Sequence, residues 1–157
     1  MLIADCGSTW SKVLELEKGK IEILPTIELN KKKYPIFDIA TGHSGKIRTK
    51  RFENELISLA KGGLSLISEE DFIIIDAGSR DVKFIKFQDR KIKKLDWNTA
   101  CGSSTGATVE MLGKYFNVEL STLEPVDGWI NVTCGVFGME KILELVSSGE
   151  APSVGIS

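Results

Sequence analysis

The sequence predicts an α/β fold made of two related units, and a repeated turn is the main reason for this prediction. The segment from Asp5 to Lys12 reads DCGSTWSK, and seventy-one residues later the segment from Asp76 to Lys83 reads DAGSRDVK. Both follow the pattern D-x-G-S-x-x-x-K, and both come after a run of branched apolar residues. Because short apolar runs that end in turn residues are typical of strands, each copy indicates a strand, a tight turn and a second strand.

The repeat extends well beyond the turn. Without a gap, residues 2–24 align with residues 73–95, and both stretches continue with an alternating segment, a polar turn and a third strand-like run. The identical pairs include Asp5/Asp76, Gly7/Gly78, Ser8/Ser79, Lys12/Lys83, Lys20/Lys91, Ile21/Ile92 and Leu24/Leu95. A single repeat at this period does not indicate a solenoid, which needs several units. The pattern predicts two three-stranded antiparallel units that open two related domains, residues 1–70 and residues 71–157.

The rest of the first domain follows from shorter signals. After the strand at 20–25 we expect a loop that contains Pro25 and Pro35, and then a short extended segment at 36–42. Residues 53–67 carry apolar side chains at helical spacing, which predicts a helix. The pair Gly62-Gly63 weakens this helix unless another element packs close to it.

In the second domain, two further helices are expected. The first begins after Ser103 or Ser104, either of which is a suitable N-cap. Its expected apolar face is Thr108, Met111, Leu112, Tyr115 and Phe116. Residues 129–134 predict a strand, and a second helix follows from about Phe137. Gly149 is a plausible stop signal for that helix.

Composition excludes several classes of partner. The 157 residues include 20 basic and 22 acidic side chains, and this near-neutral balance gives no sign of a nucleic-acid or anionic-membrane partner. No apolar stretch approaches the ~20 residues of a membrane span, and the N-terminus lacks a signal-peptide pattern. The sequence therefore predicts a cytoplasmic protein without a nucleic-acid or membrane partner.

The repeated turn has a chemical interpretation. A Gly-Ser pair between two strands exposes consecutive backbone N–H groups and a hydroxyl, and such clusters bind anions, phosphate above all. The lysine of the motif adds positive charge, and the aspartate can hold Mg²⁺ through its waters. Two such turns that face each other across a cleft would bind a triphosphate from both sides. The alternative is that D-x-G-S marks an ordinary hairpin turn in each copy.

The three cysteines divide into two groups. Cys6 lies beside the first turn, and its counterpart in the second copy is Ala77, so we interpret it as a packing residue. Cys101 and Cys134 each precede an expected helix start and each is followed by glycine. A helix N-terminus favours a thiolate or an anionic cluster. Two cysteines cannot supply the four thiolates of an iron–sulfur cluster, but a two-fold symmetric dimer can. On spacing alone, two unrelated buried cysteines are the preferred interpretation.

Six segments together resemble one family. They are DCGSTWSK, DAGSRDVK, IATGHSGK (39–46), FENELISLAKGG (52–63), NTACGSSTGATVEML (98–112) and TCGVFGMEKILELVSSG (133–149). In this order they are similar to the motifs of the ATP-dependent activators of 2-hydroxyacyl-CoA dehydratases and of the related benzoyl-CoA reductase ATPase subunits. That family lies in the acetate kinase, sugar kinase, Hsp70 and actin superfamily. The resemblance covers nearly the whole chain.

The resemblance implies two ribonuclease H-like units of the actin-like ATPase type and a set of cofactors. It implies Mg²⁺ and ATP, and a 4Fe–4S cluster held by Cys101 and Cys134 between two identical subunits. The homodimer would deliver low-potential electrons to a partner metalloenzyme under anaerobic conditions. The residues that would serve the nucleotide are catalytic Asp5 and Asp76, with Gly7, Ser8, Thr9 and Lys12 on one side and Gly78, Ser79 and Lys83 on the other.

The chain also departs from the family pattern. Ser79 and Arg80 stand where glycine and glutamine are usual, and no Gly-Gly segment of the kind that packs on adenine follows Gly149. We therefore expect the C-terminal part of the second unit to be missing or reduced, in a fragment or in a shortened relative. Two alternatives stay open: a shortened, non-hydrolysing subunit that binds a partner, and a small-molecule kinase with Glu53 or Asp81 as its base.

Overall fold

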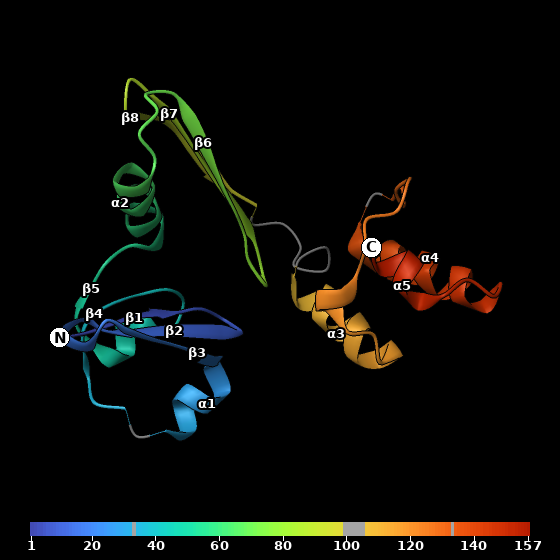
Figure 1. The fold of residues 1–157 in the computed structure, drawn as a ribbon, viewed down its shortest axis with the longest axis horizontal. Helices are drawn as coiled ribbons and strands as arrows, with labels where there is room; N and C mark the ends of the chain where they lie inside the picture. Colours follow the sequence, from blue (N-terminus) through green and yellow to red (C-terminus); the bar gives the residue numbers. More distant parts are fainter. Residues whose placement is uncertain (33, 99–105, 133) are drawn as a thin grey trace. The chain divides into compact units, whose positions relative to one another are not determined.

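The computed structural model describes all residues except 33, 99–105 and 133 (Figure 1). Contacts divide the chain into two compact units. The first consists of Met1–Ile75 and Phe84–Asp96, and the second of Asp76–Lys83 and Trp97–Ser157. The division at residue 70 that the repeat suggests stays a prediction.

A five-stranded sheet forms the N-terminal part of the first unit. Its strands are β1 (Leu2–Cys6), β2 (Trp10–Glu15), β3 (Lys20–Pro25), β4 (Phe37–Thr41) and β5 (Thr49–Phe52), in the order β3-β2-β1-β4-β5. The first three strands are an antiparallel meander, whereas β4 pairs parallel with β1, and β5 parallel with β4. The extended segment expected at 36–42 is therefore confirmed as β4.

The core of this sheet includes a short helix that the sequence did not predict. Helix α1 (Thr26–Lys31) occupies the place of the loop expected after Pro25. Its Leu29 is fully buried beside Phe37 of β4, in a cluster that includes Val13 and Leu24. Burial of a leucine side chain stabilises the folded chain by roughly 1.5–3 kcal/mol, which explains why a short polar segment is helical here.

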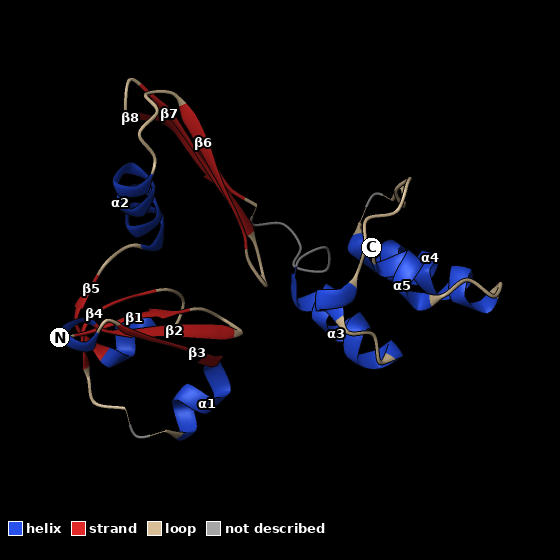
Figure 2. Cartoon of the chain, viewed as in Figure 1, coloured by secondary structure: helices blue, strands red, loops and turns tan. Residues whose placement is uncertain are grey.

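The second copy of the repeat forms a separate three-stranded sheet. Its strands are β6 (Phe72–Ala77), β7 (Val82–Gln88) and β8 (Lys91–Trp97), in the order β6-β7-β8 (Figure 2). Strand boundaries follow those of β1, β2 and β3 within one or two residues after the seventy-one-residue offset. The prediction that each copy is a three-stranded antiparallel unit in an α/β fold is confirmed.

Helix α2 (Glu55–Leu66) covers one face of this three-stranded sheet. Asn54 caps its start, because the Asn54 side-chain oxygen accepts hydrogen bonds from the N–H groups of the second and third helical residues. Ala60 packs with Ile85 and Phe87 of β7. A Cβ at Gly63 would lie 2.1 Å from the end methyl of Ile74, so the sheet packs against the helix where the glycine leaves room.

Three helices follow in the second unit: α3 (Gly106–Phe116), α4 (Gly135–Ser147) and α5 (Pro152–Ile156). Short 3-10 turns lie at Leu16–Lys18, Gly45–Arg48 and Leu120–Thr122. Helix α4 ends at the expected glycine. Gly149 has a φ of 102° and donates to Val146, while Glu150 donates to Leu145, which is the Schellman pattern.

Two expectations for the second unit are wrong. Residues 129–132 carry no strand in the described part of the chain, although their apolar residues predict one. Met111 and Tyr115, which we expect on the apolar face of α3, are 58% and 74% exposed. Periodicity alone gave these assignments, and it does not say which face a neighbouring element covers. Within the residues described, no helix has the length and apolar character needed to cross a bilayer.

Candidate functional site: two anchored turns

The first turn is anchored by the residue that begins α1. The N–H of Thr26 donates to the carbonyl of Thr9 over 2.7 Å, and its Oγ1 donates to the carbonyl of Gly7 over 2.8 Å. The fully buried Ser11 hydroxyl lies 2.8 Å from the same Oγ1 and donates to it, since the Thr26 proton is already used. Two carbonyls of the turn therefore point toward α1.

The N–H groups of the same turn remain open. Within the described residues, the N–H groups of Ser8 and Thr9 donate to no protein acceptor. A Cβ at Gly7 would lie 2.5 Å from the carbonyl oxygen of Trp10, so the turn closes too tightly for any other residue at that position. Open N–H groups beside engaged carbonyls are the arrangement found in concave anion-binding turns.

A carboxylate and an ammonium group lie beside this turn. Asp5 pairs with Lys12 across β1 and β2, and their side chains form an ion pair of 3.0 Å. Both remain accessible, with the Lys12 side chain 57% exposed and that of Asp5 36%. Their charges are available to a ligand at the turn, because exposed ion pairs of this kind are worth little and open readily.

The segment that follows β4 packs against the first turn from the other side. Gly42 has a φ of 83°, and a Cβ there would lie 2.6 Å from the Cys6 carbonyl and 2.8 Å from the Asp5 carboxylate oxygen Oδ1. The N–H of Ser44 donates to the carbonyl of Cys6 over 3.1 Å. The family-like IATGHSGK segment thus contacts the family-like DCGSTWSK turn. Sequence reasoning named both segments without bringing them together.

The second turn closes in a similar way but holds its lysine differently. The N–H of Gly78 donates to the carbonyl of Asp81 over 2.9 Å. The Lys83 ammonium lies 2.6 Å from Asp81 and 3.6 Å from Asp76, and its side chain is only 9% exposed. Lys83 is therefore buried between carboxylates, whereas its counterpart Lys12 extends into solvent.

A helix start also anchors the second turn. The N–H of Gly106 donates to the carbonyl of Gly78 over 3.2 Å, and the N–H of Ala107 donates to that of Ser79 over 3.0 Å. Both turns thus direct two carbonyls at the first residue or residues of a helix, α1 in one copy and α3 in the other. The repeat predicts the turns, but this shared anchoring was not predicted from the sequence.

The two described cysteines lie in different environments. Cys6 is fully buried, and burial, with a smaller contribution from the charge of Asp5, raises the pKa of its thiol to about 11. Its interpretation as a packing residue agrees with this. Cys134 is the N-cap residue of α4, it is half-buried, and its thiol makes no capping hydrogen bond. Cys101 lies outside the described residues.

No cluster of three or more metal-binding side chains occurs among the described residues. Such a cluster is not required for the predicted iron–sulfur site, since each subunit would supply only two thiolates.

The two carboxylates considered as kinase bases are both engaged. Glu53 lies 2.6 Å from the Lys61 ammonium, and Asp81 lies 2.6 Å from that of Lys83. The pairing lowers the pKa of Glu53. A general base works best with a pKa near the working pH, so this environment disfavours Glu53 in that role.

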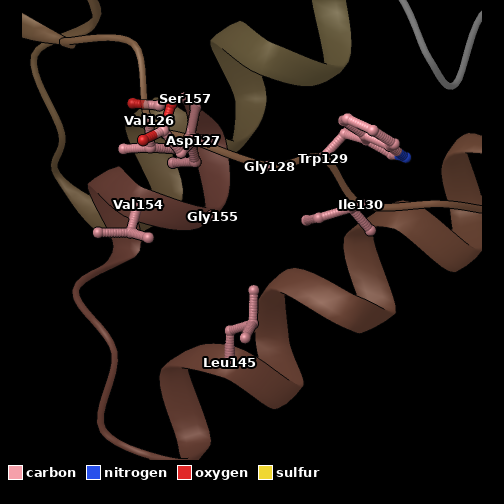
Figure 3. A pocket seen from close by; sticks show the side chains of 10 residues that line it. Val126, Asp127, Gly128, Trp129, Ile130, Leu145, Val154, Gly155 and Ser157 are labelled. Carbon is pink, nitrogen blue, oxygen red and sulfur yellow. The ribbon is translucent and has the colours of Figure 1, made fainter.

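An open hollow of about 500 Å³ lies in the second unit, between α4, α5 and residues 126–130 (Figure 3). Leu145 points into it from α4, and Val154 and Ile130 contribute further apolar surface. None of its lining residues belongs to either turn. The site that the sequence predicts is therefore distinct from this hollow.

Comparisons with known proteins bear on the identity of the fold. No protein-family model matches the chain. The (R)-2-hydroxyglutaryl-CoA dehydratase activating ATPase of Acidaminococcus fermentans is 24% identical over 174 aligned residues, which cover 92% of this chain and 66% of that protein. The chain resembles the dehydratase-activating ATPases. It spans slightly less than two thirds of the length of this curated relative.

A solved structure supports the same fold. The crystal structure of (R)-2-hydroxyglutaryl-CoA dehydratase component A from Acidaminococcus fermentans matches with a TM-score of 0.72 at 22% identity. The match covers 99% of this chain and 71% of that one. The chain therefore has the fold of the dehydratase activators, and the resemblance inferred from the six segments is confirmed.

Proposed function

We propose that the chain is an ATP-dependent activator that delivers low-potential electrons to a partner metalloenzyme, such as a 2-hydroxyacyl-CoA dehydratase. One observation carries the proposal. In the first turn, the carbonyls of Gly7 and Thr9 are held by Thr26, and the intervening N–H groups stay open. A turn whose carbonyls are engaged and whose N–H groups are open suits a phosphate.

In this proposal the first turn holds one end of the nucleotide. The N–H groups and hydroxyls of Ser8 and Thr9, next to Gly7, bind phosphate oxygens, and the exposed Lys12 ammonium turns toward them. Asp5 is suited to hold Mg²⁺ through its waters, since Mg²⁺ takes few protein carboxylates and keeps several waters. Bound Mg²⁺ would neutralise charge on the phosphates, and the positioned groups would favour attack by water.

The second turn has a comparable part in the proposal. Gly78 and Ser79 contribute donors, and Asp76 is the counterpart of Asp5. Because Lys83 is buried against Asp76 and Asp81, we expect it to hold these carboxylates in place more than to reach a phosphate. The proposal assigns the first turn to a unit of residues 1–70 and the second to a unit of residues 71–157.

Calorimetry with Mg-ATP tests the nucleotide part. We expect binding by the wild-type chain, and Lys12→Met should weaken it by about tenfold, which is the loss expected for one charge-assisted hydrogen bond. Lys20→Met is the matched control, because Lys20 is an exposed lysine at the start of β3 and away from the turn. Absence of heat at millimolar nucleotide would contradict the proposal.

The electron-transfer part rests on Cys134 and Cys101. We propose that they hold one 4Fe–4S cluster across the two-fold axis of a homodimer, with two thiolates from each subunit. Cys134 suits this role because it begins α4 with its thiol free of any capping bond, and a helix N-terminus favours negative charge. A bound cluster would supply one-electron chemistry that no side chain of the chain provides.

Anaerobic reconstitution with iron and sulfide tests the cluster. We expect a thiolate-to-iron absorption band, one cluster per dimer by iron counting, and a dimer on gel filtration. Cys134→Ser and Cys101→Ser should abolish all three, whereas the buried Cys6→Ser is the matched control and should leave them intact. A wild-type sample that takes up no iron without oxygen present would overturn this part.

A second candidate is a non-hydrolysing subunit of the same fold that binds a partner. Its support is the exposure of Val136 and Phe137, which are each 53% exposed in the first turn of α4. Nucleotide calorimetry separates the two candidates, because this one predicts no heat. The kinase alternative is disfavoured by the ion pairs at Glu53 and Asp81.

A further inference from the structure

Three polar side chains stand side by side on adjacent strands at the first turn. Asp5 of β1 pairs with Lys12 of β2 on one side and with Thr41 of β4 on the other. Residues directly opposite each other on neighbouring strands point to the same face of the sheet, and the strands lie about 4.8 Å apart. Lys12, Asp5 and Thr41 therefore form one row across the sheet, with the carboxylate in the middle.

The hydroxyl at the end of this row is an unusual group. Thr41 Oγ1 is buried, and in the part of the chain that the structure describes it has no hydrogen-bond partner. A buried hydroxyl without a partner costs about 1–3 kcal/mol. Such a cost calls for an explanation, since buried polar atoms are nearly always paired.

The two oxygens of the Asp5 carboxylate have different neighbours. Its Oδ2 is held 3.0 Å from the Lys12 ammonium. Its Oδ1 lies over Gly42, the residue that follows Thr41, at 2.8 Å from where a Cβ would stand. The carboxylate thus already lies against the end of β4, but with Oδ2 paired to Lys12 it accepts no hydrogen bond from the Thr41 hydroxyl.

We propose that Thr41 is a positioning residue for Asp5 and that its hydroxyl is the partner Asp5 takes when Lys12 leaves. In the ligand-free chain, Lys12 holds the carboxylate and the Thr41 hydroxyl is left without a partner. When Lys12 turns toward an anion at the first turn, the carboxylate becomes free to accept a hydrogen bond from Thr41. The unpaired hydroxyl is thereby explained as a donor reserved for the second state.

This exchange makes binding of an anion at the turn less costly. Breaking the Lys12–Asp5 pair would otherwise leave the carboxylate without a partner, and the Thr41 hydrogen bond offsets that loss. The exchange also gives Asp5 a fixed partner, and the proposed function, on which this step rests, assigns Asp5 to the waters of Mg²⁺.

A double-mutant cycle in the ligand-free chain tests the exchange without any nucleotide. In the wild-type background, Thr41→Val removes only an unpaired hydroxyl, so the melting temperature should stay the same or rise. In the Lys12→Met background, Asp5 is free to pair with Thr41, so Thr41→Val should lower the melting temperature by about 3 °C. Thr41→Ser keeps the hydroxyl and should restore the Lys12→Met value. An equal change in both backgrounds, or no change in either, would overturn the inference.

Calorimetry with Mg-ADP then separates this inference from the proposed function. We expect Thr41→Val to weaken binding by about tenfold and Thr41→Ser to bind like the wild type. If the wild type binds Mg-ADP and Thr41→Val binds equally well, the inference is wrong and the proposed function stands. If the wild type binds no nucleotide but the melting cycle shows the expected coupling, the proposed function is wrong and the exchange between Lys12 and Thr41 stands.

Discussion

The Thr26→Val replacement should destabilise the first turn more than the small change in side-chain shape suggests. The side chain is buried, and its hydroxyl serves two neighbours, the Gly7 carbonyl and the Ser11 hydroxyl, at 2.8 Å each. Valine has nearly the same shape, so packing is retained and only the hydrogen bonds are lost. Ser11 is fully buried and therefore out of reach of bulk solvent, which could otherwise replace its lost partner.

The magnitude follows from the two groups left unpaired. Each buried polar group without a partner costs about 1–3 kcal/mol, and the Ser11 hydroxyl can recover part of this by rotation. We expect Thr26→Val to lower the free energy of unfolding by about 2–4 kcal/mol. Mg-ATP binding should weaken as well, because a released Gly7 carbonyl would direct its negative end toward the phosphates.

Urea denaturation, followed by circular dichroism, measures the first effect. Ser11→Ala is the matched control, because it removes the buried hydroxyl but leaves the bond from Thr26 to Gly7, so its cost should be smaller. The double variant should cost less than the sum of the two single changes, since neither hydroxyl is then left facing an absent partner. A loss below about 0.5 kcal/mol for Thr26→Val would refute the idea that this hydroxyl anchors the turn.

Three further predictions concern other parts of the chain. Gly62→Ala should raise the free energy of unfolding by about 0.5–1 kcal/mol, because nothing lies near the new Cβ. The free energy of unfolding of Gly63→Ala should lie about 1–3 kcal/mol below that of Gly62→Ala, because its new Cβ must displace a β6 methyl. Chemical denaturation of both variants measures the difference. A thiol reagent at about pH 8 should modify Cys134 but leave Cys6 unmodified until the chain is denatured, because burial raises the pKa of the Cys6 thiol to about 11. Mass spectrometry of the digested protein resolves the two sites. Labelling of Cys6 in the folded chain would contradict its burial. A hydrogen bond from a lysine ammonium and another from a backbone N–H lower the pKa of Asp38. Its contribution to stability is therefore present above the usual carboxyl pKa and is lost as the pH falls through the lowered pKa. Between about pH 6 and pH 2, the melting temperature of Asp38→Asn should fall less than that of the wild type.

The sequence predicted those parts of the fold that depend on local pattern. The two meanders follow from alternating residues and a turn motif written twice, and α2 follows from helical spacing. The end of α4 at Gly149 follows because glycine adopts a positive φ at little cost. In each case the deciding residues are close together in the chain.

Features that depend on distant residues were missed or mistaken. Thr26 sits in a segment that reads as a loop, and it is helical because Leu29 is buried against strands that come before and after it. The row at the first turn joins Asp5 to Thr41 through a parallel pairing across thirty-six residues, which no local period reveals. Residues 129–132 carry the apolar pattern of a strand, but a strand needs a neighbour to pair with, and pattern alone does not supply one.

The hydrogen bonds between the second turn and the start of α3 couple the orientation of the helix to that of the turn. Two hydrogen bonds join the carbonyls of Gly78 and Ser79 to the first N–H groups of α3, and a Cβ at Gly106 would lie 3.2 Å from the Gly78 oxygen. A tilt of the turn must therefore either break both bonds or swing the eleven-residue helix with it. Because α3 is stiff along its axis, a small rotation at its base becomes a displacement of several ångströms at Phe116. A motion that began at the turn would thus be amplified at the far end of the helix.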